Sequence, residues 1–431
     1  MEMTKKDKYS VGGWTDLCWD LLTQIKCHLS LHDLVHFNFV CSNWRSVSVK
    51  QVRYVSRMPW LIVPYVVDDR SGSADRHLNM CRDGVLGFYS IIDGVTYKVE
   101  IPELYERRIC GSSFGWLISV HANSEMQLVN PLSRKVLNLP ALTNSPDVVG
   151  TIVSENRGVF YRVSGYLNRE SYADWHQSAV DLRESFIYKA ITSPESDSMV
   201  QTPIVVCLPL KLANLFFCRQ GDESWTTIDC QNNRYSDITF FNGDLYALCM
   251  SGEVDIVRGL VGFSPPITSL FASISMTHDW RQTNNYLVAS STELLQVVRF
   301  YSIWVCPENV RTELHIRGDY RDEVMSVYSG CRFTEKFSVF RLDFTAQTWV
   351  EVKNLGDRAL FVGSNDSFSV VASEFPECRG NCIYFSDDLK MRHFNGHDKG
   401  MYSLDDDKIE KICPINSKYI CPRPFWYSAI Q

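Results

Sequence analysis

Residues 20–47, DLLTQIKCHLSLHDLVHFNFVCSNWRSV, decide how the N-terminal part of this chain folds. Apolar residues recur every four positions in the first half of this region, at Leu17, Leu21, Ile25 and Leu29. A second series steps by three and four, at Leu34, Phe37, Cys41 and Trp44. Such spacing predicts two amphipathic helices, and Ser30 with Asp33 has the spacing of a capping box at the start of the second. Two helices this short cannot bury both apolar stripes alone, so we expect them to need a partner surface.

The order of residues in this region resembles the F-box, and especially its plant form. The resemblance covers residues 13–58 and rests on Trp14, Leu17, Leu21, Leu22, Ile25, Leu29, residues 30–34, Phe37, Val40, Cys41 and residues 43–46. The F-box usually opens with a Leu-Pro pair, whereas Leu17 is followed here by Cys18. Proline at that position would fix the backbone that enters the first helix. An ordinary helical hairpin folded onto the next domain is the alternative interpretation.

Composition limits what the rest of the chain can be. Of 431 residues, 45% are hydrophobic and 22% charged, which is typical of a folded protein with a large second domain. The net charge of −7 argues against nucleic acid as a partner, because phosphate binding needs a basic face. No apolar run approaches the roughly 20 residues of a membrane helix, and residues 1–12 read as a flexible tail without a secretory signal. Fifteen scattered cysteines predict reduced thiols, so we expect a protein of the nucleus or cytoplasm, without a membrane partner.

Beyond Trp60 the apolar pattern changes from helical spacing to short strands. Residues 116–120, 126–130 and 135–139 predict a three-stranded meander, and Asn242-Gly243 predicts a two-residue hairpin turn. Residues 339–344 with 348–352, and 401–404 with 408–412, repeat the theme near the C-terminus. Repeated units of about 40 to 50 residues predict a β-propeller of about six to eight blades. A pair of stacked β-sandwiches is the structural alternative.

Several blocks in this β-rich part resemble the kelch-like domain of plant KIB-type F-box proteins. They are residues 81–84, 115–116, 130–132, 286–290, 293–297, 340–343, Trp349, 360–363 and 381–387. The fold class we predict is a small all-α F-box module followed by a large all-β domain, a propeller of six to eight blades. The predicted boundaries are a tail over residues 1–12, the F-box over 13–58, a linker over 59–75 and the KIB-type domain over 76–431.

The family resemblance implies a substrate receptor of an SCF ubiquitin ligase. In that role the F-box docks on the Skp adaptor, which leads to a cullin and a RING subunit, while the propeller captures a target protein. Holding the target near the ubiquitin-charged enzyme raises the local concentration of a target lysine, so this chain needs no catalytic group. By resemblance, the residues at adaptor-facing or interhelical positions are Leu17, Cys18, Leu21, Ile25, Leu29, Leu34, Val40 and Trp44. Helical spacing does not divide these two roles.

The sequence offers little for catalysis, metals or cofactors. Cys378 and Cys382 lack a second pair at zinc spacing, and neither a phosphate-binding glycine loop nor a hydrolase serine elbow is present. We therefore expect no cofactor, no metal and no enzymatic activity. The alternatives are a non-ligase scaffold that sequesters a partner protein and, less favoured, a propeller enzyme.

Overall fold

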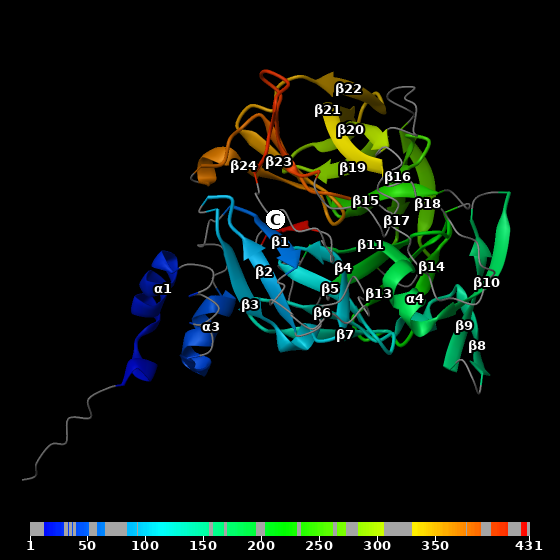
Figure 1. Cartoon of the computed structure of the whole chain (residues 1–431), viewed down its shortest axis with the longest axis horizontal. Coiled ribbons are helices and arrows are strands. Elements are labelled where there is room, and N and C mark those ends of the chain that lie inside the picture. Colours follow the sequence, from blue (N-terminus) through cyan, green and yellow to red (C-terminus); the bar gives the residue numbers. More distant parts are fainter. Residues whose placement is uncertain are drawn as a thin grey trace, which may run out of the picture.

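The computed structural model describes residues 13–29, 33, 37, 40–50, 58–64, 84–92, 94–154, 158–167, 170–194, 203–230, 234–261, 265–272, 283–305, 330–375, 377–388, 398–412 and 424–428. Helical segments open this part of the chain: η1 (Trp14–Asp16), α1 (Trp19–His28) and α3 (Ser42–Lys50). They lie beside a larger body of β-sheets (Figure 1). Ser30 of the predicted capping box falls outside the described residues.

The first sheet joins the two ends of the β-rich part of the chain. Its strand order is β28 (Phe425–Tyr427), β1 (Trp60–Pro64), β2 (Val85–Tyr89) and β3 (Thr96–Glu100). Strands β28 and β1 pair antiparallel, with Trp60 opposite Tyr427. The predicted linker over residues 59–75 is therefore wrong where it includes β1. This apolar, aromatic and β-branched run is buried in the sheet, an environment that favours such residues.

Three further sheets are meanders whose strands follow chain order. The first contains β4 (Arg107–Ser113), β5 (Trp116–His121), β6 (Met126–Val129) and β7 (Val136–Leu139). The second contains β11 (Ile187–Thr192), β12 (Ile204–Pro209), β13 (Leu215–Arg219) and β14 (Thr226–Ile228). The third contains β15 (Tyr235–Phe241), β16 (Asp244–Cys249), β17 (Val254–Arg258) and β18 (Ile267–Ala272). The predicted strands over residues 116–120, 126–130 and 135–139 are confirmed as β5, β6 and β7.

The turn between β15 and β16 confirms the hairpin predicted from Asn242-Gly243. Asn242 has a φ of 50° and Gly243 a φ of 86°. Two successive residues in the left-handed region are what a type I′ turn requires, and Asn-Gly adopts it with little strain.

A nine-stranded sheet holds most of the C-terminal third. Its order is β22 (Thr348–Val352), β21 (Gly330–Asp343), β20 (Leu294–Val305), β19 (Thr283–Ala289), β24 (Phe368–Val371), β23 (Arg358–Val362), β25 (Cys382–Phe385), β26 (Gly400–Ser403) and β27 (Ile409–Glu410). Its two halves meet at a single parallel pair, Ala289 with Phe368. In the part of the chain that the structure describes, three short 3-10 helices lie among the sheets: η3 (Pro102–Leu104), η4 (Leu142–Asn144) and η6 (Ala372–Glu374).

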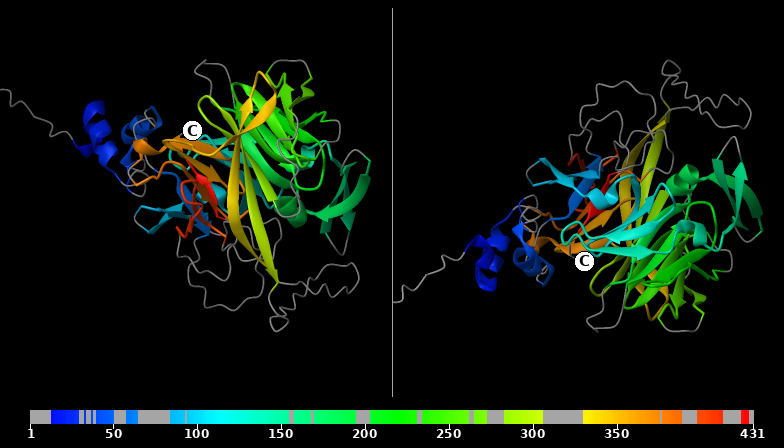
Figure 2. Two further views of the ribbon diagram at one scale, coloured as in Figure 1. Left: turned by 90° about the horizontal axis from the view of Figure 1, so that it is seen from above. Right: turned by 90° about the horizontal axis from the view of Figure 1, so that it is seen from below.

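One sheet falls outside this regular series. Strands β10 (Tyr172–Ser178), β9 (Gly158–Tyr166) and β8 (Val148–Ser154) form a three-stranded sheet, followed by α4 (Ala179–Ser185). Figures 1 and 2 show this sheet standing out from the edge of the body, on the side away from α1 and α3. The repeat pattern in the sequence did not predict it.

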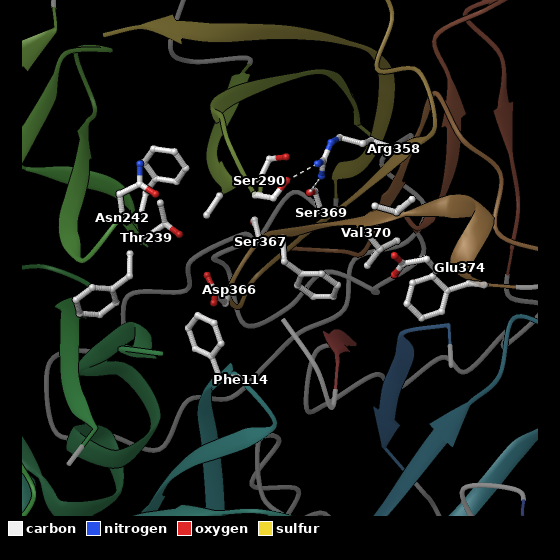
Figure 3. Close-up of a pocket in the computed structure, with 17 residues that line it drawn as sticks. Phe114, Thr239, Asn242, Ser290, Arg358, Asp366, Ser367, Ser369, Val370 and Glu374 are labelled. Carbon is white, nitrogen blue, oxygen red and sulfur yellow. Dashed lines mark hydrogen bonds between the residues drawn. The ribbon is translucent and has the colours of Figure 1, made fainter. Parts of the chain in front are cut away.

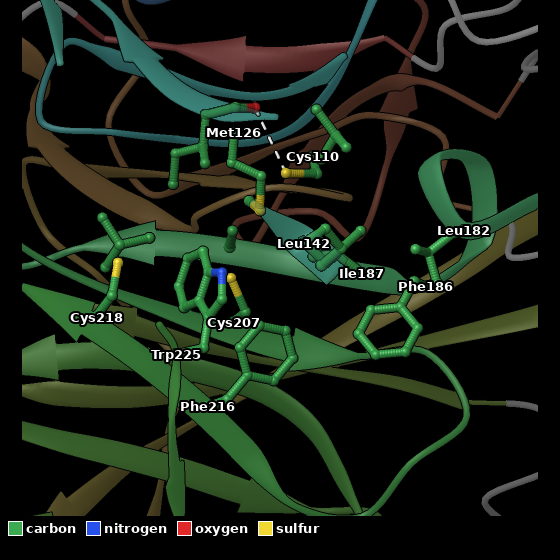
Figure 4. Packing of buried hydrophobic residues seen from close by; sticks show 14 of the residues in the cluster. Cys110, Met126, Leu142, Leu182, Phe186, Ile187, Cys207, Phe216, Cys218 and Trp225 are labelled. Carbon is green, nitrogen blue, oxygen red and sulfur yellow. Dashed lines mark hydrogen bonds between the residues drawn. The ribbon is translucent and has the colours of Figure 1, made fainter. Parts of the chain in front are cut away.

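Buried apolar clusters connect each sheet to the next. In one of them Cys110 and Met126 of the β4–β7 sheet pack with Cys207 and Phe216 of the β11–β14 sheet (Figure 4). Another closes the series, because it contains Leu61 of β1 together with Phe361 of β23 and other residues of the nine-stranded sheet. The sheets therefore surround a common axis, which is a propeller-like arrangement.

The described cysteines agree with the expectation of reduced thiols. Each carries a free thiol, and Cys110, Cys207 and Cys218 pack within one apolar cluster (Figure 4). Burial raises the pKa of Cys110 to about 11, so its thiol is neutral near pH 7. A neutral buried thiol packs as a small apolar side chain and is a poor nucleophile.

Candidate functional site

The candidate site is built on the packing of α1 against α3. Leu22 of α1 and Val47 of α3 are fully buried, and Phe37 packs with them. The rings of Phe37 and Trp44 lie 4.5 Å apart between their centroids. These contacts give the helical region an apolar core of its own, so the two helices hold a fixed relation to each other.

Side chains of α3 hold the segment that precedes α1. The Trp44 indole Nε1 donates a hydrogen bond to the Trp14 carbonyl at 2.9 Å. The Asn43 amide donates to the carbonyls of Thr15 and Leu17, each at 3.2 Å. The chain from Trp14 to Leu17 is thus tied across the start of α1, and the Trp14 side chain is left 75% exposed.

The structure separates the predicted adaptor residues into three groups. Cys18, Leu21 and Val40 are exposed, the latter two at 48% each. Four others are partly buried and pack against the core of the helical region: Leu17, Ile25, Leu29 and Trp44. Leu34 lies outside the described residues. Exposed apolar residues are available to a partner, whereas the second group first serves the packing of the helices.

The apolar stripe expected from the sequence lies mostly against the core of the helical region, where Leu17, Ile25 and Leu29 are partly buried. Its fourth member, Leu21, is 48% exposed, while the next residue, Leu22, has no exposed surface. Leu17 precedes α1, which begins at Trp19. Leu29 also packs against the apolar cluster of the β28–β3 sheet, which contains Trp60, and so contributes to the junction with the β-rich body.

Trp14 is the residue that the sequence analysis passed over as a site. Its exposure makes it the most accessible large apolar side chain described near α1. Tryptophan is enriched at the energetic centres of protein interfaces. Its place just before the first apolar stripe was the available signal.

Cys18 occupies the position where the F-box usually has proline, and its backbone already has proline-like geometry. It is the N-cap of α1, with φ −70° and ψ 157°, and Leu17 before it is extended with φ −59° and ψ 137°. Proline requires a φ of about −65° and an extended preceding residue. The backbone at Cys18 is therefore compatible with proline.

We expect Cys18→Pro to maintain or strengthen binding to a Skp-type adaptor and to raise stability by about 0.4–1 kcal/mol, because proline restricts the unfolded chain. Titration of purified adaptor against both variants measures the affinity. Thr23→Pro, inside α1, is the control and should lose about 3 kcal/mol of stability. A marked loss of affinity in Cys18→Pro would show that α1 does not enter as described.

Other parts of the described chain give no sign of a metal or membrane site. No group of three or more His, Cys, Asp or Glu side chains gathers there in a way that could hold a metal ion. Within the same residues, no helix has the length and apolar character needed to cross a bilayer.

Comparison with known proteins identifies the β-rich body. Residues 88–403, well over half of the chain, match the family model described as KIB1-4 beta-propeller. The chain belongs to this family. The family match agrees with the resemblance expected from the sequence and with the series of sheets around one axis.

Relatives that match almost the whole chain carry F-box names. The F-box protein SKIP23 of Arabidopsis thaliana is 26% identical over 96% of this chain and 96% of its own length. F-box protein At4g35733 of the same plant is 25% identical over 92% of this chain and 95% of its own length. F-box protein At2g26160 is 23% identical over 88% of this chain and 96% of its own length. At the level of the family, the chain is similar to F-box proteins that carry a β-propeller.

Proposed function

We propose that this chain is the target-recognition subunit of an SCF-type ubiquitin ligase. Residues 13–58 act as the F-box and dock on a Skp-type adaptor, which connects to a cullin and a RING subunit. The KIB-type propeller captures a protein for ubiquitination, in the nucleus or cytoplasm, and the chain itself performs no chemistry. We also infer six blades, formed by four four-stranded sheets and the two halves of the nine-stranded sheet.

The observation that carries this proposal is the apolar surface on the helical region. Trp14, Leu21 and Val40 remain exposed although α1 and α3 already have a buried core. Three large apolar side chains exposed on so small a unit favour a protein partner. The F-box names of relatives that span nearly the full chain indicate the class of that partner.

We expect Leu21→Asp to abolish adaptor binding while the protein stays folded. The exposed side chain tolerates a charge in the free protein, but burying an unpaired carboxylate in the interface costs several kcal/mol. Pull-down of purified adaptor and thermal unfolding of the same variant measure the two effects separately.

Two control variants make this experiment decisive. Val180→Asp places the same charge on α4, at an apolar residue that is 37% exposed, and should leave adaptor binding intact. Leu22→Asp, at a fully buried position, should instead unfold the helical region. Adaptor binding by Leu21→Asp at the level of the unchanged protein would leave the non-ligase scaffold as the better description.

A further inference from the structure

A cavity of about 460 Å³ opens among the hairpin turns of neighbouring sheets. Its lining comes from the turn after β4, the end of β15 and its turn, the end of β19 and its turn, the start of β23, strand β24 with the segment before it, and η6 (Figure 3). Ligand sites commonly have volumes of about 300–1,000 Å³ and a few convergent polar groups in an apolar wall. This cavity has both features.

A cationic group with only hydroxyl partners lies at one side of the cavity. Arg358 donates from Nη1 to the Ser369 hydroxyl at 3.0 Å and from Nη2 to the Ser291 hydroxyl at 2.5 Å. Among the described residues no carboxylate forms an ion pair with its guanidinium. Because both hydroxyl oxygens accept from Arg358, the hydrogen of each hydroxyl is left to be donated elsewhere.

Two more serines line the same cavity, and their hydroxyls are buried without hydrogen bonds that the structure describes. Ser290 is 5% exposed and Ser367 is 1% exposed, and neither Oγ has a partner within the described part of the chain. An unsatisfied buried hydroxyl costs about 1–3 kcal/mol. Its presence beside a guanidinium indicates a group that supplies acceptors when it binds.

The opposite side of the cavity carries an aromatic residue with a strained backbone, Phe114. Phe114 has a φ of 47° in the two-residue turn it shares with Gly115, and its ring faces the cavity (Figure 3). A bulky aromatic residue rarely adopts the left-handed region, and such strain concentrates at ligand-binding positions. The equivalent turn between β15 and β16 has Asn242, the residue that suits this conformation.

Two acidic residues also line the cavity, and neither forms an ion pair with Arg358 in the part of the chain that the structure describes. Asp366 accepts a hydrogen bond from the Ser113 hydroxyl at 2.7 Å and lies 4.0 Å from the Lys189 ammonium. Glu374 is exposed at the rim. The groups around Arg358 are therefore donors, and the positive charge there has no countercharge that the structure describes.

We propose that this cavity receives an extended segment of the captured protein, with an oxyanion side chain, phosphate or carboxylate, at Arg358 and a neighbouring aromatic side chain against Phe114. The inference rests on the proposed function, since it names the chemistry by which the propeller selects its target. Arg358 and the serine hydroxyls supply charge and donors, while the phenylalanine wall supplies apolar contact. Phosphate and carboxylate share this chemistry and are separated by experiment.

The test uses the full chain and three blocked, fluorescein-labelled pentapeptides, Ala-Phe-X-Ala-Ala, in which X is phosphoserine, glutamate or lysine. Fluorescence polarisation should show binding of at least one acidic peptide about tenfold tighter than the lysine peptide, and Arg358→Gln should remove this preference. The acidic peptide that binds more tightly shows whether the cavity prefers a phosphate or a carboxylate group. Equal binding of all three peptides, or an unchanged preference in Arg358→Gln, overturns the proposal.

Variants at the serines and at Phe114 exclude a merely structural role. Ser290→Ala removes an unsatisfied hydroxyl, so it should keep or raise the unfolding midpoint. The same variant should bind the acidic peptide more weakly. Ser119→Ala is the matched control, because Ser119 is also buried and unsatisfied but lies outside the cavity, and it should leave peptide binding unchanged. Phe114→Asn should likewise raise stability and weaken binding. Loss of stability without loss of binding in Ser290→Ala and Phe114→Asn would contradict the proposal.

Adaptor pull-down on the same preparations keeps the two proposals separate. Adaptor binding without any selective peptide binding overturns the cavity proposal and supports the ligase proposal. Selective peptide binding without adaptor binding supports the cavity proposal and overturns the ligase proposal.

Discussion

Lys189→Met should destabilise the propeller by about 3–5 kcal/mol at pH 7.5, because it removes the cation that serves two buried carboxylates. Lys189 of β11 is 2% exposed and ion-pairs with Asp237 of β15, while its Nζ lies 4.0 Å from Asp366. Asp237 also accepts the Leu287 amide of β19 at 2.8 Å. Lys189 therefore connects the β11–β14 sheet, the β15–β18 sheet and the nine-stranded sheet. Its ammonium supplies the positive charge beside both buried carboxylates.

The loss of stability in Lys189→Met should be smaller at pH 5 than at pH 7.5. Burial raises the pKa of Asp366 to about 6, and burial also raises the pKa of Asp237, with Lys189 opposing both shifts. An acid whose folded pKa lies above its unfolded pKa binds more protons in the folded state, so stability falls as pH rises between the two values. Without Lys189 both folded pKa values rise further, and the variant should recover part of its stability at pH 5.

Urea unfolding at pH 5 and 7.5 measures this prediction. Lys98→Met is the control: Lys98 pairs with Glu100 at 2.7 Å, but their side chains are 42% and 68% exposed, so the loss should stay below about 1 kcal/mol. Adding Asp366→Asn to Lys189→Met should restore part of the stability. A loss equal to that of the Lys98 variant, or one that grows at pH 5, would contradict the assigned role.

Arg299→Met should also lower the stability of the folded protein by about 3–5 kcal/mol, because Arg299 joins the two halves of the nine-stranded sheet. Its side chain is fully buried and forms ion pairs with Asp388 at 3.4 Å and Asp398 at 2.9 Å. It also donates to the Thr334 hydroxyl at 2.8 Å and the Ser386 carbonyl at 2.9 Å. Met fills much of the volume but leaves two carboxylates without their cation.

Arg299→Lys distinguishes charge from geometry. Lysine keeps the charge but cannot reproduce the fork of donors, so its stability should lie between those of the unchanged protein and Arg299→Met. Arg341→Met is the matched control in the same sheet, since Arg341 pairs with Glu293 at 3.0 Å with side chains 50% and 34% exposed. Urea unfolding midpoints and hydrogen exchange in β19 and β25 report the effect. Equal losses in the Arg299→Met and Arg341→Met variants would show that burial of the pair is unimportant.

The sequence alone determined the features that depend on neighbours along the chain. Short apolar runs separated by turn residues predicted β5, β6 and β7, and Asn242-Gly243 predicted its turn, because strand-forming runs, turn residues and left-handed φ are local properties. The ordered F-box and KIB-type residues indicated the family that the chain matches over residues 88–403. Helical spacing predicted helices in the N-terminal region but did not separate exposed Leu21 from the residues that pack in the core, because the face that each helix buries depends on its neighbours.

Only the tertiary structure decided which distant residues meet. Trp60 pairs across from Tyr427, and Lys189 finds Asp237 and Asp366, because closing a ring of sheets brings strands from both ends of the chain together. The same closure gathers Arg358, Ser290 and Phe114 at one cavity from three separate hairpins. Strand patterns are fixed by the pleat of each segment, whereas these contacts depend on the order and packing of whole sheets, which no local spacing specifies.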